Sequence, residues 1–260
     1  MGINSHVQLP HGVIKYFRDE TDPEKKVWYL DIDTGEIRRK AARKLGTEKG
    51  YFSETAEKYL CAEIESPIAE LNAKIREFVA NEVESIGITQ DDVVTAKDYV
   101  KASMLRGKPA IDAMYESSYT ARLFSAQDNH DNLLVFGMNA RGKFDEYLDR
   151  YSFTLLRNTS NVHFVVPRCC VIPLSKEDAS FIIAPISPYA ALLFCSPEIL
   201  QEKESYGVVE KDDAVRHINE LALEYEFASN RDFVASDREN ELAELLPTLH
   251  RLKEREKAEP

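Results

Sequence analysis

The stretch FIIAPISPYAALLF, residues 181–194, decides the fold class of this chain. Its two ends, 181–184 and 190–194, are short runs of branched and aromatic side chains, and the proline and serine between them favour a turn. Similar runs occur at 151–156 and 162–166. These four runs predict strands of a sheet.

Helical patterns follow the strands. Residues 197–204, 211–228 and 237–255 have the composition of helices, and the last two are amphipathic. Amphipathic helices bury their apolar faces against a neighbouring layer. We therefore expect an antiparallel sheet that is covered by C-terminal helices.

The part of the chain before the sheet is predicted to be helical. An apolar stripe between residues 53 and 85 keeps its phase through Pro67, which predicts one kinked but continuous helix. Further helices are expected from Thr89 to Leu105, over 110–124, and over 129–150 with a break at Gly142. The stripe consists of Leu60, Ile64, Ile68, Leu71, Ile75 and Phe78.

Residues 1–50 form a small β-rich segment in this interpretation. Apolar runs at 13–17 and 27–30 are short, and 27–30 and 36–38 flank a glycine-containing turn at 31–35. The turn also begins like a calcium loop, but it lacks the glutamate that such a loop needs at its twelfth position. We therefore predict a β-hairpin there.

The fold class that follows is α+β in a single domain over residues 1–260. It has an N-terminal hairpin (about 1–50), a helical middle (about 53–150) and an antiparallel sheet with C-terminal helices (about 151–255). No stretch rich in glycine, serine or proline marks a domain boundary.

The net charge of −12 bears on possible partners. An acidic surface repels phosphate backbones, so we expect neither non-specific binding of duplex DNA nor binding to an anionic membrane. Residues 38–44 carry five positive charges, and we interpret this run as a solvated helix face or loop. A local basic groove remains open, as does a protein partner or a homo-oligomer.

The four cysteines are Cys61, Cys169, Cys170 and Cys195. Their number and spacing favour free thiols in a reducing compartment over a zinc site. The chain begins without the pattern of a signal peptide, and no apolar run is long enough to span a bilayer. We expect a cytoplasmic protein, and the sequence predicts no metal-binding residues and leaves the cofactor unknown.

The common catalytic motifs are missing from this sequence. It contains no phosphate-binding P-loop, no dinucleotide-binding glycine motif, no serine-hydrolase elbow and no zinc-protease helix. Its six histidines have no metal-binding spacing. Candidate site residues therefore come from polar side chains in unusual places.

Glu57 is the first candidate, because it lies three residues before Leu60 and so falls on the inward arc of the stripe. A buried carboxylate needs a partner, and we expect Arg106, His6 or His11 to supply it. It then serves as a general base or metal ligand, or it is a structural ion pair. Glu65, outside this arc, is a secondary candidate.

Arg106 and the two N-terminal histidines complete the set. Arg106, beside a glycine at a helix end, is suited to clamp a phosphate or carboxylate, or simply to favour the helix C-terminus. His6 can act as an acid or base near neutral pH, and His11 is a secondary candidate for the same role.

Several short motifs resemble those of a bacterial family known as domain of unknown function forty-two thirty-eight. Two departures stand out: Val166-Pro167 replaces a Ser-Asp pair that many members carry after a phenylalanine strand, and His6 is one residue further from its proline. The resemblance implies no activity. It rests on His6, residues 9–17, Tyr51-Phe52-Ser53, Glu57, Leu60, Glu65, Arg106, Pro109, residues 164–167, 185–188 and 217–219.

Two functions of different classes follow. The first is a hydrolase or nuclease-like effector that uses His6, Glu57 and Arg106, with an association to bacterial defence or toxins that comes from the kind of family and not from any residue. The second is a non-catalytic binding or regulatory module. Our expectation leans towards the effector.

Overall fold

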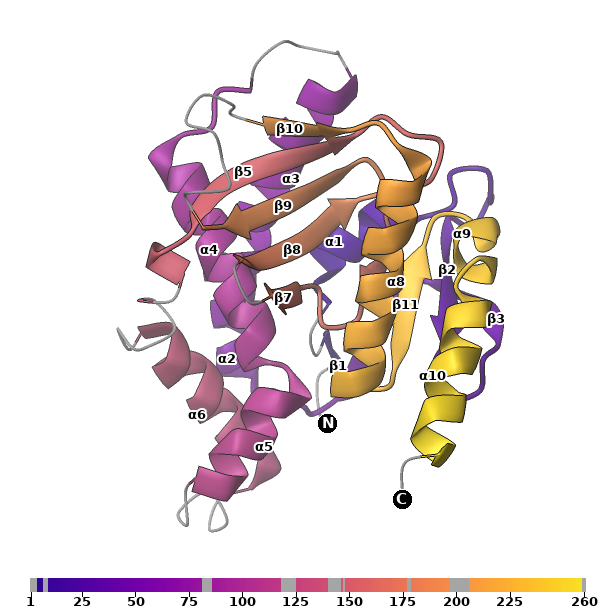
Figure 1. Ribbon diagram of the computed structural model, residues 1–260. Helices are drawn as coiled ribbons and strands as arrows, with labels where there is room; N and C mark the ends of the chain where they lie inside the picture. Colours follow the sequence, from indigo (N-terminus) through magenta and orange to yellow (C-terminus); the bar gives the residue numbers. More distant parts are fainter. Residues whose placement is uncertain are drawn as a thin grey trace.

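The structure is a computed structural model, and it describes residues 4–6, 9–80, 86–117, 125–139, 146, 148–176, 179–196 and 206–258. It contains two main sheets and several helices, which confirms the predicted α+β class (Figure 1).

The larger sheet has five strands in the order β10-β5-β9-β8-β7. The quoted stretch forms its central hairpin, β8 with β9, in which Ile182 pairs with Phe194. The pair of β10 and β5 is parallel, so the sheet is only partly antiparallel. The strands are β5 (Ser152–Asn158), β7 (Ile172–Lys176), β8 (Ala179–Ser187), β9 (Ala190–Cys195) and β10 (Tyr206–Val209).

The smaller sheet joins the two ends of the chain. Its order is β3-β2-β11-β6, and the predicted hairpin is present with Leu30 opposite Ile37. The hairpin pairs with a strand near the C-terminus, since Phe233 lies opposite Asp31. The strands are β2 (Lys26–Asp31), β3 (Ile37–Ala41), β6 (Val166–Pro167) and β11 (Phe233–Ser236); β1 (Asn4–His6) and β4 (Thr47–Lys49) form a separate pair.

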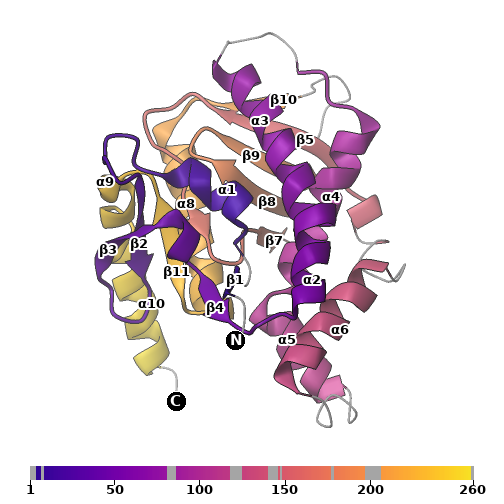
Figure 2. The same cartoon turned by 180° about the vertical axis from the view of Figure 1, so that it is seen from behind.

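Helices cover both faces of the five-stranded sheet. Helix α8 (Asp212–Ser229) crosses one face (Figure 1), and α1 (His11–Ile14) and α3 (Ser66–Ala80) lie on the other (Figure 2). The remaining helices described are α4 (Gln90–Leu105), α5 (Lys108–Ser117), α6 (Ala126–Asn139), α9 (Glu239–Ala243) and α10 (Leu246–Ala258).

The predicted kinked helix is continuous as far as Ala80. It comprises α2 (Glu54–Tyr59), the π-helical turn η3 (Leu60–Glu65) and α3. Proline has no N–H to complete the α-helical ladder, and the π turn ends at Glu65, two residues before Pro67. The expected stripe is buried from Leu60 to Phe78. The start of α4 is also confirmed, because Thr89 and Asp92 form a capping box.

Four local predictions are wrong. Residues 13–17 are helical, in α1 and η1 (Lys15–Phe17), because Val13, Ile14 and Phe17 are buried as one helical turn. The basic run lies on β3 and the 3₁₀ turn η2 (Ala42–Lys44), although its side chains are largely exposed. Residues 237–255 form two helices, because Pro247 belongs at a helix start.

The fourth correction concerns 162–166, where only Val166 belongs to a strand. The side chain of Asn219 accepts a hydrogen bond from the Val165 N–H at 2.9 Å and donates one to the His163 carbonyl at 2.8 Å. The Asn219 side chain therefore makes the backbone hydrogen bonds that a neighbouring strand would otherwise make. The helices expected over 197–204 and 118–124, and the break at Gly142, lie outside the described residues.

No helix among the described residues is long and apolar enough to cross a membrane.

Candidate functional site

Arg106 is the predicted site residue that is most deeply buried. Its side chain is fully shielded from solvent and ends 3.7 Å from the carboxylate of Glu65, which is 22% exposed. Burial of such a pair is weak evidence for stability, because desolvation of both charges offsets their attraction. The pair joins two of the residues that the sequence singled out.

The inward position of Glu65 corrects the prediction that it lies outside the buried arc. The prediction assumed α-helical geometry throughout, but Glu65 is the last residue of the π turn, where the Ser66 N–H bonds to the Cys61 carbonyl. Bonding over five residues brings position i+5 above position i. Glu65 therefore stands close to the direction of buried Leu60.

Buried polar side chains, among them Cys170 and Tyr99, lie around Arg106. Burial raises the pKa of the Cys170 thiol to about 12, although the Arg106 charge and a hydrogen bond from Tyr99 act in the opposite direction. Burial likewise raises the pKa of Tyr99 well above its usual value. Both of these groups are therefore neutral near pH 7, and the Glu65 carboxylate is the ion-pair partner of Arg106.

Glu57 and His6 stay predictions as site residues. The Glu57 side chain is half-buried and its Oε1 atom is sealed from solvent, as its place on the stripe indicates. His6 belongs to β1, opposite Thr47 of β4, and its side chain lies outside the described part of the structure. The convergence of His6, Glu57 and Arg106 on one cleft is therefore untested.

His11 lines a pocket whose location the sequence analysis did not predict, although it left a local basic groove open. Helix α1 places its ring against Arg18, whose Nη2 is 3.4 Å from His11 Nε2. The pocket has a volume of about 490 Å³, and the basic run contributes Arg43 to it. Its walls are formed by His11, Arg18, Glu24, Lys25, Lys26, Ala41, Ala42 and Arg43.

The cations of this pocket fall into two groups. Lys25 pairs with Glu20 at 3.4 Å, and Lys26 pairs with Glu24. Neither Arg18 nor Arg43 has a carboxylate partner among the residues that the structure describes. The pocket therefore carries an excess of positive charge within an acidic protein.

The His11 imidazole responds to this charge. Burial and the neighbouring Arg18 and Lys15 cations lower the pKa of His11 below its usual value. The ring is consequently neutral at pH 7, and its Nε2 accepts the hydrogen bond from Arg18. An anion in the pocket would favour the protonated ring.

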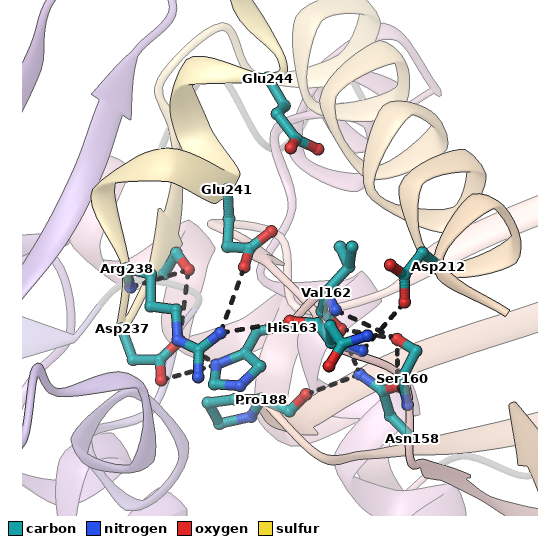
Figure 3. Close-up of polar contacts among 12 residues, drawn as sticks. Asn158, Ser160, Val162, His163, Pro188, Asp212, Asp237, Arg238, Glu241 and Glu244 are labelled. Atoms are coloured by element: carbon teal, nitrogen blue, oxygen red, sulfur yellow. Dashed lines mark hydrogen bonds and ion pairs between the residues drawn. The ribbon is translucent and has the colours of Figure 1, made fainter. Parts of the chain in front are cut away.

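A second polar cluster, which the sequence analysis missed, surrounds His163 (Figure 3). Its Nδ1 lies 2.8 Å and 2.9 Å from the two carboxylate oxygens of Asp237. Asp237 directly follows β11, which pairs with Val166-Pro167 of β6. Nothing in the sequence relates positions that are 74 residues apart.

The described residues contain no group of three or more histidine, cysteine or carboxylate side chains arranged to hold a metal ion. All four cysteines are free thiols, as predicted.

No protein-family model, no curated protein and no solved structure matches this chain.

Proposed function

We propose that this protein is a binding module that holds a phosphate-bearing small molecule in the pocket of His11, Arg18 and Arg43. The observation that carries the proposal is the pair of arginines without a carboxylate partner among the described residues. Other basic side chains nearby are neutralised: Arg38 pairs with Glu36, and Arg39 pairs with Asp22 at 3.1 Å.

The chemistry of the walls fits a phosphate group. A guanidinium presents parallel N–H donors that match two oxygens of a phosphate, and these charge-assisted hydrogen bonds are stronger than neutral ones. The His11 ring lies beside Arg18 and can bind the same anion. A volume of about 490 Å³ lies in the range of small-molecule sites, and Ala41 and Ala42 offer an apolar wall for the rest of the ligand.

The same surface is poorly suited to duplex DNA. A nucleic-acid site needs many phosphate contacts along an extended basic face. Here the net charge is −12, and Glu24 lines the pocket itself. We therefore expect a small ligand, and the absence of non-specific DNA binding stays a prediction.

Titration with inorganic phosphate and with adenosine monophosphate, followed by NMR, tests this function. We expect saturable shifts of the amides around residues 11–18 and 41–43. Arg18→Gln and Arg43→Gln should each weaken binding about tenfold, the size of one charge-assisted hydrogen bond. Arg38→Gln removes the same charge from β3 outside the pocket and serves as the control.

Two outcomes contradict the proposal: the absence of shifts at millimolar ligand, or an equal effect of Arg38→Gln and Arg43→Gln. The hydrolase or nuclease-like function with His6, Glu57 and Arg106 stays a prediction. A different histidine-carboxylate pair, His163 with Asp237, is present among the described residues.

A further inference from the structure

The loop between β5 and β6 holds His163 in one place. Asn158, which is buried, donates to the Val162 carbonyl at 2.7 Å, and Asn219 bonds the backbone on both sides of residue 164. Buried amides with satisfied hydrogen bonds fix a loop more firmly than exposed turns do. The His163 ring therefore starts from a rigid backbone.

The ring itself is oriented by Asp237. Because a carboxylate only accepts hydrogen bonds, Nδ1 carries a proton, and in the neutral ring the lone pair is then on Nε2. No hydrogen bond of Nε2 is found in the part of the chain that the structure describes, and the His163 side chain is 3% exposed. A carboxylate that orients a histidine in this way is the arrangement of a general base.

Two half-exposed side chains border the histidine. The Tyr189 ring meets the His163 ring edge to face, with 4.6 Å between their centroids, and Tyr189 is 43% exposed. The Arg238 side chain is 44% exposed and is held by the Asn161 carbonyl at 3.2 Å and by Glu241 at 3.8 Å. An aromatic ring thus contacts the His163 ring, and Figure 3 shows the Arg238 side chain next to it.

The charge of the cluster selects the substrate class. Figure 3 draws Asp212, Glu241 and Asp237 with Arg238, whereas the Glu244 carboxylate pairs with Arg216 at 2.9 Å. This excess of carboxylates repels a phosphodiester. A neutral carboxylic ester meets no such repulsion, and Arg238 can stabilise the negative charge that develops on its carbonyl oxygen.

We propose that His163 and Asp237 form an acid-base pair that hydrolyses neutral carboxylic esters. Nε2 takes a proton from a water molecule while the water oxygen attacks the carbonyl carbon. When the tetrahedral intermediate collapses, the bond from carbon to the alcohol oxygen breaks, and the proton on Nε2 passes to the departing alkoxide. The products are a carboxylic acid and an alcohol, and no co-reactant besides water is used.

The test is hydrolysis of p-nitrophenyl acetate by the full chain at neutral pH. The background carries Cys61→Ser, because the exposed thiol of Cys61 also attacks this ester. We expect His163→Gln to lower the rate about 100-fold, as for loss of a general base, and Asp237→Asn to lower it less. Bis(p-nitrophenyl) phosphate should not be hydrolysed.

His250 supplies the matched control, because it is an exposed histidine 3.2 Å from the carboxylate of Glu254. His250→Gln should leave the rate unchanged. Equal rates for the wild-type chain and His163→Gln, or equal losses in the His163 and His250 variants, overturn the proposal. Hydrolysis of the phosphodiester instead of the acetate overturns the assigned substrate class.

Two further measurements cover a purely structural role of the pair and the case in which His163→Gln does not fold. If the pair only fastens the loop, His163→Gln lowers the melting temperature and the wild-type chain has no esterase rate, which rejects the proposal. If His163→Gln fails to fold, ¹⁵N NMR of the wild-type ring decides. Nδ1-protonated imidazole with a solvent-accessible Nε2 supports the pair, and the opposite tautomer rejects it. Failure here leaves the phosphate pocket unaffected.

Discussion

His163 Nδ1 lies 2.8 Å from the carboxylate of Asp237, and this contact joins the loop before β6 to the residue that follows β11. The two positions are 74 residues apart, and the contact is largely shielded from solvent, with side-chain exposures of 3% for His163 and 14% for Asp237. The contact depends on a loop whose backbone is held by Asn219. The free energy of unfolding of a variant at Asn219 therefore tests whether this loop is held as described.

Asn219→Ala removes one hydrogen bond to the Val165 N–H and one to the His163 carbonyl. Both backbone groups are then buried without a partner, so the free energy of unfolding should fall by about 2–4 kcal/mol. Urea denaturation measures the change. His217→Ala, on the exposed face of the same helix, should change it by less than about 0.5 kcal/mol. Equal effects of the two variants would show that Asn219 does not hold the loop.

Glu226 makes stability depend on pH. Burial raises the pKa of its carboxyl from 4.5 to about 7, even though the Cys169 N–H donates to Oε2 at 3.0 Å. The folded protein thus binds more protons than the unfolded chain between these values. Its free energy of unfolding therefore contains a contribution that is present below pH 4.5 and is lost as the pH rises to about 7.

Glu226→Gln removes this dependence and keeps the hydrogen bond from Cys169. Relative to the wild-type chain, the variant should gain stability as the pH rises from 5 to 8, by about 3 kcal/mol at most. Urea denaturation of both proteins at each pH cancels the contributions of all other groups. A difference that is constant with pH would contradict the raised pKa.

The buried pair of Arg106 and Glu65 predicts a non-additive effect. Arg106→Met leaves the Glu65 carboxylate without its guanidinium partner, so the free energy of unfolding should fall by about 3 kcal/mol or more. Adding Glu65→Met removes the uncompensated charge and should recover much of the loss. If the double variant is as unstable as Arg106→Met alone, the two side chains are not coupled.

The thiols should differ in reactivity. Cys61 is exposed, whereas the other three cysteines are buried, and burial raises the pKa of Cys170 to about 12. A disulfide reagent such as dithionitrobenzoate should therefore modify one thiol in the native protein and all four after denaturation. Rapid modification of a second thiol in the native state would contradict the burial of the other three cysteines.

The strongest sequence patterns predicted the fold correctly. The stripe through Ile64 and Ile68, the start at Thr89 and the hairpin at 31–35 each reflect interactions between residues close in sequence. Strand β7 was missed, because Pro173 weakens its strand pattern; prolines are tolerated on edge strands, and β7 is at the edge.

The candidate sites were harder to predict, because long-range contacts create them. Glu65 turns inward only because the helix widens at η3, and Arg43 reaches the His11 pocket only because β3 folds back beside β2. The pairing of His163 with Asp237 depends on how β6 and β11 meet. Local periodicity contains none of these relationships.

The pKa of His11 with and without sulfate tests the central proposal most directly. Sulfate keeps its two negative charges throughout the range in which histidine titrates, so any change belongs to the protein. The proposal predicts that saturating sulfate raises the pKa of His11, which Arg18 and Lys15 help to hold low, and that binding tightens as the pH falls. An NMR titration in which the His11 pKa is the same in both solutions would contradict an anion site in this pocket.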